Sequence, residues 1–509
     1  MGKEFLLGID IGTSGCKITI FDFEGHVIRW ITETYQTFYP GPGRVEQDAN
    51  EWWRAVCRGI KHLTAMTAIN PENIAGIGVD GHGWTCLPMD KFGQPLSPAM
   101  IWLDRRSVRQ AEYLKKEFGA NFLTELNGNP VDPAYVLPKI LWLREEEPEI
   151  FKKTHFFLQS NSFIVYKLTG IASQDYSQSY GYHCFDIKKG VWNSTVAETL
   201  SLSLDLIPPL SKCHENVGFV SDNAATETGL VSGIPVVAGG LDAACSTLGA
   251  GVVNPGQTQE QGGQAGGMSM VLDEPKIHPK LILGYHVLPD KWLLQGGTVG
   301  GGGTLKWFAN QLGAFEQKLA DENGKSVFEI LSDEAAQIGP GSDGLVFLPY
   351  MLGERSPIWN SNARGVFFGL SYHKTRAHLI RSIMEGVGFS LLHNLMTALE
   401  VNAAVNELNS VGGSSNSHVW TQIKADITGK VINVPYSDHA TPLGAAILAG
   451  VGNGVYQDFN EAVTRVVRIH RRHMPNGESH RLYRKYFQLY LDLYENLKDC
   501  YETLAKIEL

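Results

Sequence analysis

The stretch Leu6 to Ile20, LLGIDIGTSGCKITI, decides the fold of this 509-residue chain. Two apolar runs flank a polar, glycine-rich centre, a pattern that predicts a strand, a tight turn and a second strand. Gly12 lets the backbone turn tightly, while Thr13 and Ser14 add hydroxyl groups and consecutive amides that can face one concavity. Such a turn suits a phosphate group. Asp10, at the end of the first strand, is placed to hold a hydrated Mg²⁺ beside that phosphate.

A plain glycine-rich hairpin explains the same residues. In that interpretation Asp10 caps its own turn and binds nothing else. The local sequence leaves both interpretations open, and the rest of the chain decides between them.

The composition describes a globular protein with more than one domain. At 509 residues, the chain exceeds what one hydrophobic core usually serves. Hydrophobic residues make up 43% and charged residues 19%, and a net charge of -10 disfavours nucleic acid or an anionic membrane surface as the main partner. No run of apolar residues is long enough to predict a membrane span.

Seven cysteines are scattered along the chain without a C-x-x-C pair. Isolated cysteines in an odd number are typical of reduced thiols that are buried as small residues. The first residues also lack the apolar length of a signal peptide. We therefore expect a cytoplasmic protein.

A polar cluster follows a predicted strand at Ile74 to Val79. Asp80, Gly81 and His82 come directly after it, and the carboxyl end of a strand is the usual edge of an α/β binding crevice. The letters GIGVDG imitate a dinucleotide fingerprint. Because these glycines lie within the strand and no helix opens after them, we reject a nicotinamide site.

The segment Ile101 to Arg106, IWLDRR, is predicted to be a short strand that ends in charged residues. Asp104 is a candidate ligand residue at that end. Adjacent charges such as Asp104 and Arg105 also commonly pair with each other, so both interpretations of Asp104 stay open.

The stretch Ile234 to Gly251, IPVVAGGLDAACSTLGAG, presents a further carboxylate at the end of a strand. The strand breaks at Gly239 and Gly240, shows Asp242, and continues into a helix of small residues. On the local sequence alone, the favoured interpretation of Asp242 is a cap of that helix.

Directly after this helix, GQTQEQGGQAGGMSMVL repeats the opening pattern of strand, glycine-rich turn and strand. The second turn runs from Gly262 to Gly267. An internal duplication, with two halves that face a shared cleft, explains the repeat. We therefore predict two domains, residues 1–251 and 252–509.

Two further glycine-rich segments precede predicted helices. Gly302 lies in the run GGTVGGGGT, which suits phosphates, with a flexible lid as the alternative. Gly412 and Gly413 precede a helix that begins near His418, where free amides and a flat surface suit a planar ring. The GKS triplet at residues 324–326 lacks the first glycine of a Walker loop, so it is not a P-loop.

Two longer motifs resemble the signatures of a known family, the FGGY carbohydrate kinases of the sugar kinase, hexokinase and actin superfamily. The carboxy-terminal signature is matched in full by GVFFGL at 365–370 and by HL and SIME within 378–385. The amino-terminal signature is matched by KILWL at 139–143, but Val136 stands where a small hydroxyl residue or proline is usual. With the turns that follow Asp10 and Gly239, the resemblance covers nearly the entire chain.

This resemblance implies an α/β fold of two actin-like, ribonuclease H-like domains with an interdomain cleft. ATP would bind mainly to the second domain and the sugar mainly to the first, with Mg²⁺ as the metal. By position, Asp242 would be the catalytic base in contact with the sugar, and Asp10 the carboxylate linked to Mg²⁺. The implied ATP contacts are Gly12, Thr13, Ser14, Gly262, Gly263, Gly302, Gly413 and Ser417. The implied sugar contacts are Asp80, Gly81, His82 and Asp104.

Within the family, EQD at 46–48, the pair His82-Gly83 and the stretch LPYMLGERSPIWNSNARGVFFGL look most like xylulose kinases. Two departures concern the sugar pocket. Asp80 and Gly81 replace the usual glutamine and methionine, and Ala243 replaces the asparagine that tends to follow the catalytic aspartate.

We therefore expect an ATP-dependent carbohydrate kinase, with D-xylulose, converted to D-xylulose 5-phosphate, as the first choice of substrate. L-xylulose, ribulose, gluconate and glycerol stay open as substrates, and a homodimer stays open as the assembly.

Two functions of other classes would share the predicted fold. An actin-like ATPase has no need of the polar cluster at Asp80 to His82 or of the carboxy-terminal signature. A catalytically silent, sugar-responsive regulator has no need of Asp242. Both are therefore disfavoured alternatives.

Overall fold

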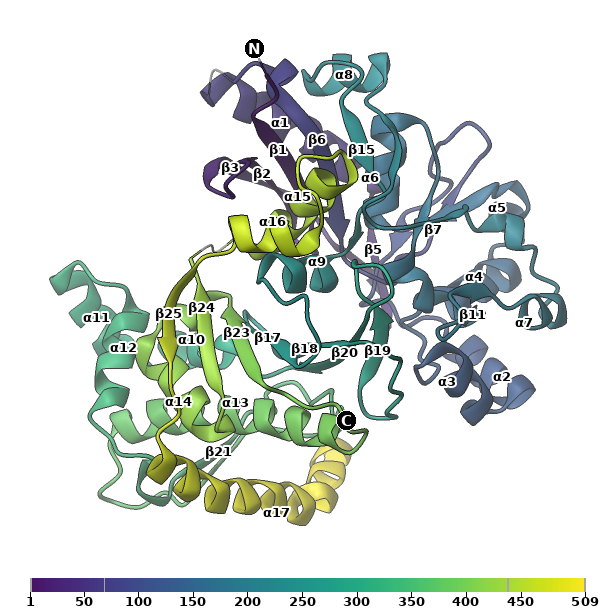
Figure 1. Ribbon diagram of the computed structural model, residues 1–509. Coiled ribbons are helices and arrows are strands. Elements are labelled where there is room, and N and C mark those ends of the chain that lie inside the picture. Colours follow the sequence, from purple (N-terminus) through teal and green to yellow (C-terminus); the bar gives the residue numbers. More distant parts are fainter. Residues whose placement is uncertain (1, 68, 437–438, 508–509) are drawn as a thin grey trace.

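The computed structural model describes residues 2–67, 69–436 and 439–507. It contains two seven-stranded sheets, each flanked by helices, that form two α/β domains (Figure 1). The outermost ends of the predicted domains, residues 1 and 508–509, lie outside the described residues.

The first sheet has the order β14-β15-β6-β1-β2-β3, and β16 also pairs with β6. Its strands are β1 (Phe5–Ile11), β2 (Gly15–Asp22), β3 (Val27–Thr34), β6 (Ile74–Gly81), β14 (Asn216–Phe219), β15 (Pro235–Val237) and β16 (Gly240–Leu241). β1, β2 and β3 form an antiparallel meander, while β6 runs parallel to β1, and β15 and β16 run parallel to β6. The predicted strand, turn and strand between Leu6 and Ile20 are confirmed.

The second sheet repeats this topology in the order β19-β20-β18-β17-β23-β24-β25. Its strands are β17 (Gln257–Gly262), β18 (Gly266–Leu272), β19 (Ile282–Tyr285), β20 (Trp292–Thr298), β23 (Glu407–Val411), β24 (Val431–Pro435) and β25 (Ile469–His473). β17, β18 and β20 form an antiparallel meander, and β23 and β24 continue parallel to β17. The predicted second strand, turn and strand are therefore the counterpart of the first.

The helices cover the faces of both sheets (Figure 1). In the first half of the chain, the helices around the sheet are α1 (Ala49–Thr67), α6 (Ser160–Thr169), α8 (Asp222–Thr228) and α9 (Asp242–Gly249). Those of the second half are α10 (Gly302–Leu312), α11 (Ala314–Asn323), α12 (Val327–Ala336), α13 (Arg376–Leu399), α14 (His418–Thr428), α15 (Ala440–Gly452), α16 (Phe459–Val466) and α17 (Gly477–Ile507). Among the described helices, none is long and apolar enough to cross a membrane.

Further strands and helices extend the first domain beside its sheet. They are β4 (Phe38–Gly41), β5 (Arg44–Gln47), β7 (Leu87–Met89), β8 (Ala99–Met100), β9 (Phe156–Leu158), β10 (Gln174–Asp175), β11 (Phe185–Asp186), β12 (Val191–Trp192), β13 (Leu210–Ser211), α2 (Val108–Phe118), α3 (Ala120–Asn127), α4 (Val136–Glu146), α5 (Pro148–Lys153) and α7 (Ser194–Thr199). In the second domain, β21 (Val346–Leu348) pairs with β22 (Val366–Phe368). The extension of the first domain has its own buried cluster, centred on α4.

Contacts cross the predicted domain boundary. α15 and α16, which the sequence prediction assigns to the second domain, pack with the first sheet, where α15 contacts β1, β6 and α9 (Figure 1). The contact is backbone to backbone. A Cβ atom on Gly8 would lie 2.1 Å from the Pro442 carbonyl oxygen, and one on Gly78 would lie 1.9 Å from that of Ala445. Gly78, one of the glycines that imitate a dinucleotide fingerprint, thus allows a helix to pack closely on the strand.

The predicted strand at Ile101 to Arg106 is wrong. β8 ends at Met100, and the chain then turns, with the Asp104 amide donating to the Ile101 carbonyl at 3.0 Å. The Asp104 carboxylate accepts from the Val45 amide at 2.7 Å and from the Arg106 guanidinium. These contacts stabilise a compact loop, because a buried carboxylate needs hydrogen-bond donors to offset its lost hydration.

A buried ion pair joins three elements at the centre of the second sheet. The Lys424 ammonium, on α14, donates to the Glu260 carboxylate of β17 at 2.7 Å and to the Ser414 hydroxyl at 3.1 Å. Both charged side chains are nearly inaccessible to solvent. Ser410 of β23 donates to the same carboxylate.

Replacement of Lys424 by Met should destabilise the second domain by about 3–5 kcal/mol, because it leaves the Glu260 charge buried without a partner. Urea unfolding followed by circular dichroism measures the loss. Lys498→Met is the matched control, since Lys498 pairs with Glu495 at the surface, and it should cost less than about 1 kcal/mol. Equal losses in the two variants would contradict the assigned role.

Candidate active site

A cavity of about 450 Å³ lies between the two sheets and is lined from both domains. Asp10 and Thr13 from the first turn, together with His82 and Asp242, form one wall. The opposite wall is formed by residues 265–269, at the end of the second turn and the start of β18, by residues 295–297 of β20, and by Arg355. The structure therefore brings both glycine turns and two of the predicted carboxylates into one cleft.

Three aspartates meet at the carboxyl ends of neighbouring parallel strands. Asp10 of β1 is the register partner of Asp80 of β6, and Gly240 of β16 is the partner of Asp80 on its other side. Asp242 follows two residues beyond Gly240. The sheet thus fixes the three carboxyl groups side by side, although they are distant in sequence.

Burial raises the pKa of the Asp10 carboxyl to about 6, while the neighbouring Asp80 carboxyl and the charge of Lys17 act in the opposite direction. Burial, and after it the charges of Asp10 and Asp242, raises the pKa of Asp80 well above its usual range. Asp80 is therefore a neutral neighbour of Asp10. It is fully buried and does not line the cavity.

Asp242 is the first residue of α9, and Leu241 is the cap, so the capping role favoured by the local sequence is not the one observed. Its carboxylate accepts from the Ala243 amide at 2.6 Å. Burial, followed by the Asp10 charge, raises the pKa of Asp242 to about 7. A carboxyl group with this pKa is suited to accept a proton near neutral pH.

The backbone before Asp242 is held by buried polar side chains. The Leu241 amide donates to the Ser177 hydroxyl at 2.8 Å, and that hydroxyl donates to Asp175 at 2.5 Å. The Asn161 amide group donates to the other oxygen of Asp175 at 3.0 Å. Residues 173–193 show little recognisable pattern in the sequence, so this support could not be predicted.

His82 reaches the cavity as a neutral imidazole. Burial, with a smaller contribution from the nearby Lys139 charge, lowers the pKa of His82 to about 3. Its Nδ1 lies 3.0 Å from the Thr85 hydroxyl, and its buried Nε2 has no hydrogen-bond partner among the described residues. That nitrogen is free to exchange a hydrogen bond with a sugar hydroxyl.

Aromatic side chains complete the wall beside His82. Trp84, Trp102 and Tyr180 line the cavity, and none of them was predicted from the sequence. The Lys139 ammonium donates to the carbonyl oxygens of Trp84 and Ile101 at 2.8 and 2.7 Å, which ties the two tryptophan loops together. Lys139 belongs to the amino-terminal signature motif, and it was the one sequence feature that could have pointed to these tryptophan loops.

The first turn is held in place by side chains from the extension of the first domain. The Gln47 amide group donates to the Thr13 carbonyl at 2.6 Å, and Trp102 donates to the Thr13 hydroxyl at 3.0 Å. Tyr35 donates to the Gly12 carbonyl. Gly12 and Thr13 line the cavity, whereas Ser14 is exposed outside it.

Two other predicted sugar contacts do not reach the cavity. Gly81 is buried against α6, where a Cβ atom would lie 2.4 Å from the Ser160 hydroxyl. Asp104 is buried in its loop, and its carboxylate oxygens are taken by Val45 and Arg106. Arg105, the expected partner of Asp104, pairs with Asp132 instead.

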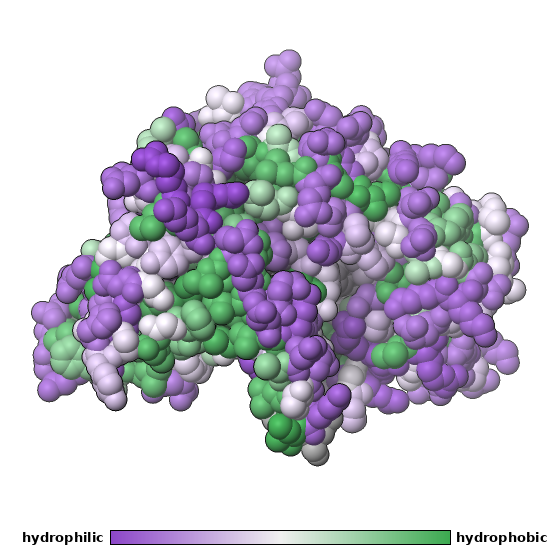
Figure 2. Space-filling view, turned by 90° about the horizontal axis from the view of Figure 1, so that it is seen from below, coloured by the Kyte–Doolittle hydropathy of each residue, from purple (hydrophilic) through white to green (hydrophobic). Residues whose placement is uncertain are grey.

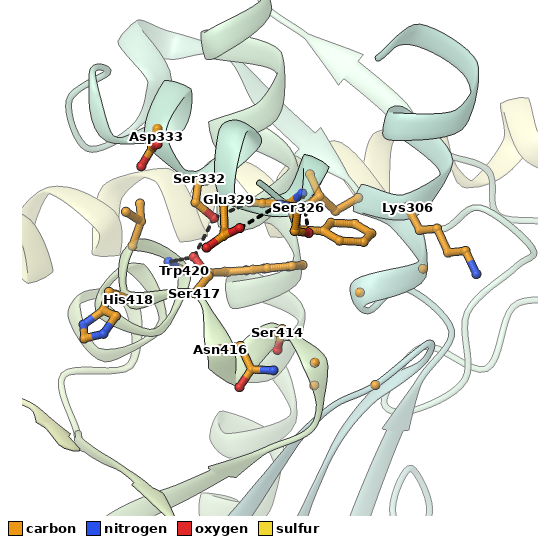
Figure 3. A pocket seen from close by; sticks show the side chains of 18 of the residues that line it. Lys306, Ser326, Glu329, Ser332, Asp333, Ser414, Asn416, Ser417, His418 and Trp420 are labelled. Carbon is orange, nitrogen blue, oxygen red and sulfur yellow. Dashed lines mark hydrogen bonds between the residues drawn. The ribbon is translucent and has the colours of Figure 1, made fainter. Parts of the chain in front are cut away.

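A second, larger cavity of about 730 Å³ adjoins the second glycine turn (Figure 3). Five predicted ATP contacts line it: Gly262, Gly263, Gly302, Gly413 and Ser417. Figure 3 shows Ser326, Glu329 and Ser332 of the α12 region facing Ser417 and Trp420 of the α14 region. The apolar lining, which includes Leu305, Phe328 and Trp420, suits a planar base.

The glycine loops of this cavity are locked to each other. The Gly302 amide donates to the Gly263 carbonyl at 2.8 Å, and a Cβ atom on Gly302 would lie 2.7 Å from that oxygen. The Ser417 hydroxyl caps α14 and lies 2.8 Å from the Ser332 hydroxyl. Lys306 and Lys325 also line the cavity. The turn at residues 262–267 lines both cavities, so the two cavities adjoin at this turn. A phosphate chain that reaches from one cavity to the other would pass along it.

Asp10 is the residue through which the site fits Mg²⁺. Its carboxylate lines the cleft beside the first turn. In proteins Mg²⁺ is commonly held by one or two carboxylates, several waters and the phosphates of a substrate. Asp10 would supply one such carboxylate, with the phosphates of ATP and water as the other donors.

The fold and the paired cavities define a two-domain phosphotransferase of the actin-like class. The chain matches the amino-terminal domain of the FGGY family of carbohydrate kinases over residues 5–249 and the carboxy-terminal domain over residues 266–452. It belongs to this family and is an ATP-dependent carbohydrate kinase.

Individual relatives resemble the chain over its full length. A xylulose kinase of Staphylococcus epidermidis is 33% identical over 100% of both chains, and a gluconokinase of Bacillus subtilis is 30% identical over 99% of this chain and 98% of that one. The crystal structure of a xylulose kinase from Rhodospirillum rubrum superposes with a TM-score of 0.86 at 27% identity, covering 98% of this chain and 100% of that one.

The raised pKa of Asp242 predicts a pH dependence. Below about pH 7 the carboxyl group is protonated and cannot accept the proton of the sugar hydroxyl, so kcat/KM for the sugar should fall about tenfold per pH unit. Initial rates at saturating ATP measure it, with circular dichroism at each pH as the control for folding. A kcat/KM that stays constant down to about pH 5 would contradict this assignment.

Proposed function

We propose that this kinase transfers the γ-phosphoryl group of ATP to a hydroxyl group of D-xylulose, forming D-xylulose 5-phosphate. The observation that carries the proposal is the position of Asp242, a carboxylate of raised pKa in the same cleft as both glycine turns. The full-length likeness to xylulose kinases supports D-xylulose as the acceptor.

In the proposed reaction, Asp242 accepts the proton of the sugar hydroxyl while the oxygen attacks the γ-phosphorus. His82, Trp84 and Tyr180 line the space for the sugar and orient it. Amides of the turns at Gly12 and Gly262 face the phosphates and stabilise their developing charge. Asp10 would hold Mg²⁺, which neutralises phosphate charge when bound.

Gluconate is the second candidate acceptor. A gluconokinase resembles the chain over nearly its whole length. The sequence differences from the xylulose kinase pattern, at Asp80, Gly81 and Ala243, do not discriminate between D-xylulose and gluconate. Asp80 and Gly81 do not line the cavity, whereas Ala243 does, next to Asp242.

The Asp242→Ala variant tests the proposal. Loss of the base should lower kcat by about 10²–10⁴-fold or more, while ATP affinity stays within about threefold, because Asp242 lies outside the second cavity. Magnesium-dependent ADP release is measured with D-xylulose, gluconate, L-xylulose, ribulose and glycerol.

Asp222→Ala is the matched control, since Asp222 is the first residue of the surface helix α8 and does not line either cavity. Unchanged turnover in Asp242→Ala would overturn the base. A response to another acceptor would move the substrate, and ADP release that no acceptor stimulates would favour an ATPase.

We also propose that the enzyme is a cytoplasmic homodimer. Its seven cysteines are free thiols, which supports a cytoplasmic location. Leu352, Leu370 and Tyr372 are exposed on the second domain. Figure 2 shows hydrophobic residues gathered on the side of that domain in the view from below, which supports a homodimer.

Light scattering should give twice the mass of one 56.0 kDa chain. A single-chain mass at all concentrations would exclude the dimer.

A further inference from the structure

Arg355 is the one lysine or arginine among the described residues that line the central cleft. It belongs to the Gly-Glu-Arg-Ser-Pro turn at residues 353–357, which has no role in the proposed reaction. Its charge sits in a wall that otherwise consists of glycines, small polar residues and apolar side chains. Such an isolated cation in a binding cleft calls for an explanation.

The turn is fixed to the end of β20, so the direction of the Arg355 side chain is set by the backbone. The Glu354 carboxylate accepts from the amides of Val299 and Arg355 at 2.6 and 2.8 Å. The Ser356 amide donates to the Gly297 carbonyl at 3.0 Å, and the Asn394 side chain donates to the Ser356 carbonyl at 3.1 Å. One oxygen of the Glu354 carboxylate is thus occupied by hydrogen bonds from backbone amides.

The guanidinium lies flat against a glycine. A Cβ atom on Gly297 would come within 3.1 Å of Nη2 and 3.2 Å of Cζ, so a larger residue here would push the guanidinium aside by a few tenths of an ångström. Among the described residues, the guanidinium makes one hydrogen bond, to the Thr298 carbonyl at 3.3 Å. It has five N–H donors, and burial lowers its pKa. Most of its donors are left for a ligand.

Arg355 lines the central cleft and not the larger cavity expected to hold the base of the nucleotide. The nucleotide cavity lies by β17, β23 and the start of α10, and Arg355 does not line it. Arg355 lies over β20, on the other side of β18 in the strand order. Asp242 belongs to the facing wall, on the first domain. A sugar whose hydroxyl group meets Asp242 would extend toward Arg355 with its far end.

We propose that Arg355 is a specificity-determining residue that binds a planar oxygen acceptor at the end of the substrate remote from the phosphorylated hydroxyl. The acceptor is the keto group of a ketose or the carboxylate of an aldonate. The rigid guanidinium fork can donate two parallel hydrogen bonds to a carboxylate and at least one to a carbonyl oxygen. A polyol without such a group gains less from it. This inference rests on the proposed function.

The test compares Arg355→Met and Arg355→Lys with the wild type on three acceptors: D-xylulose, D-gluconate and xylitol. Loss of the charged hydrogen bonds should raise KM for D-xylulose or D-gluconate by about 10- to 100-fold. KM for ATP should stay within about threefold, and any weak activity with xylitol should be unchanged. Arg355→Lys keeps the charge but loses the planar fork, so it should show most of the effect.

Arg105→Met is the control, because Arg105 is exposed and pairs with Asp132 away from the cleft. Thermal unfolding of each variant checks the fold, and if Arg355→Met does not fold, Arg355→Lys decides the matter.

Three outcomes would overturn the inference. The first is an unchanged KM for every acceptor, the second is an equal loss with xylitol, and the third is a loss in KM for ATP alone, which would place Arg355 on the phosphates. A wild type that phosphorylates none of the acceptors would overturn the proposed function and this inference together. A wild type that is active while both variants keep its sugar KM would overturn the inference alone.

Discussion

The architecture depends on the close backbone contact between α15 and the first sheet. Helices usually pack on a sheet through side chains, but here Gly8 and Gly78 bring the strands against the carbonyl oxygens of Pro442 and Ala445. A helix from the second half of the chain is thereby fastened to the first domain. α9, which begins with Asp242, packs on the same helix. The position of the Asp242 carboxylate therefore follows from a steric constraint on glycines far from it in sequence.

The duplicated topology explains why the chemistry lies between the domains. Each sheet delivers a glycine turn at the end of its first strand, and the two turns face each other across one cleft. The first domain adds carboxylates, an imidazole and aromatic side chains. The second adds the locked glycine loops of the larger cavity and the Arg355 side chain. Neither half is complete alone, so closure of the cleft would assemble the site and exclude water from it.

Much of the fold could be predicted because the decisive signals are local. The strand, turn and strand units, the helix that begins at Asp242 and the repeated topology follow from apolar periodicity and glycine placement. The position of α15 could not be predicted, since it depends on a backbone contact between distant segments. The prediction of a strand at Ile101 to Arg106 was wrong because the Asp104 carboxylate accepts hydrogen bonds from nearby amides, which stabilise a loop instead. For the same reason Asp104 was a poor sugar candidate. The wall of Trp84, Trp102 and Tyr180 gave no periodic signal, because its residues come from loops and short turns.

The central claim is that the cleft moves a phosphoryl group from ATP to a sugar. Phosphorus-31 nuclear magnetic resonance of the reaction with ATP, Mg²⁺ and D-xylulose or gluconate tests it most directly. We expect a sugar phosphomonoester that forms in equal amount to ADP, with little inorganic phosphate. Inorganic phosphate equal to ADP, without a phosphomonoester for any acceptor, would contradict it.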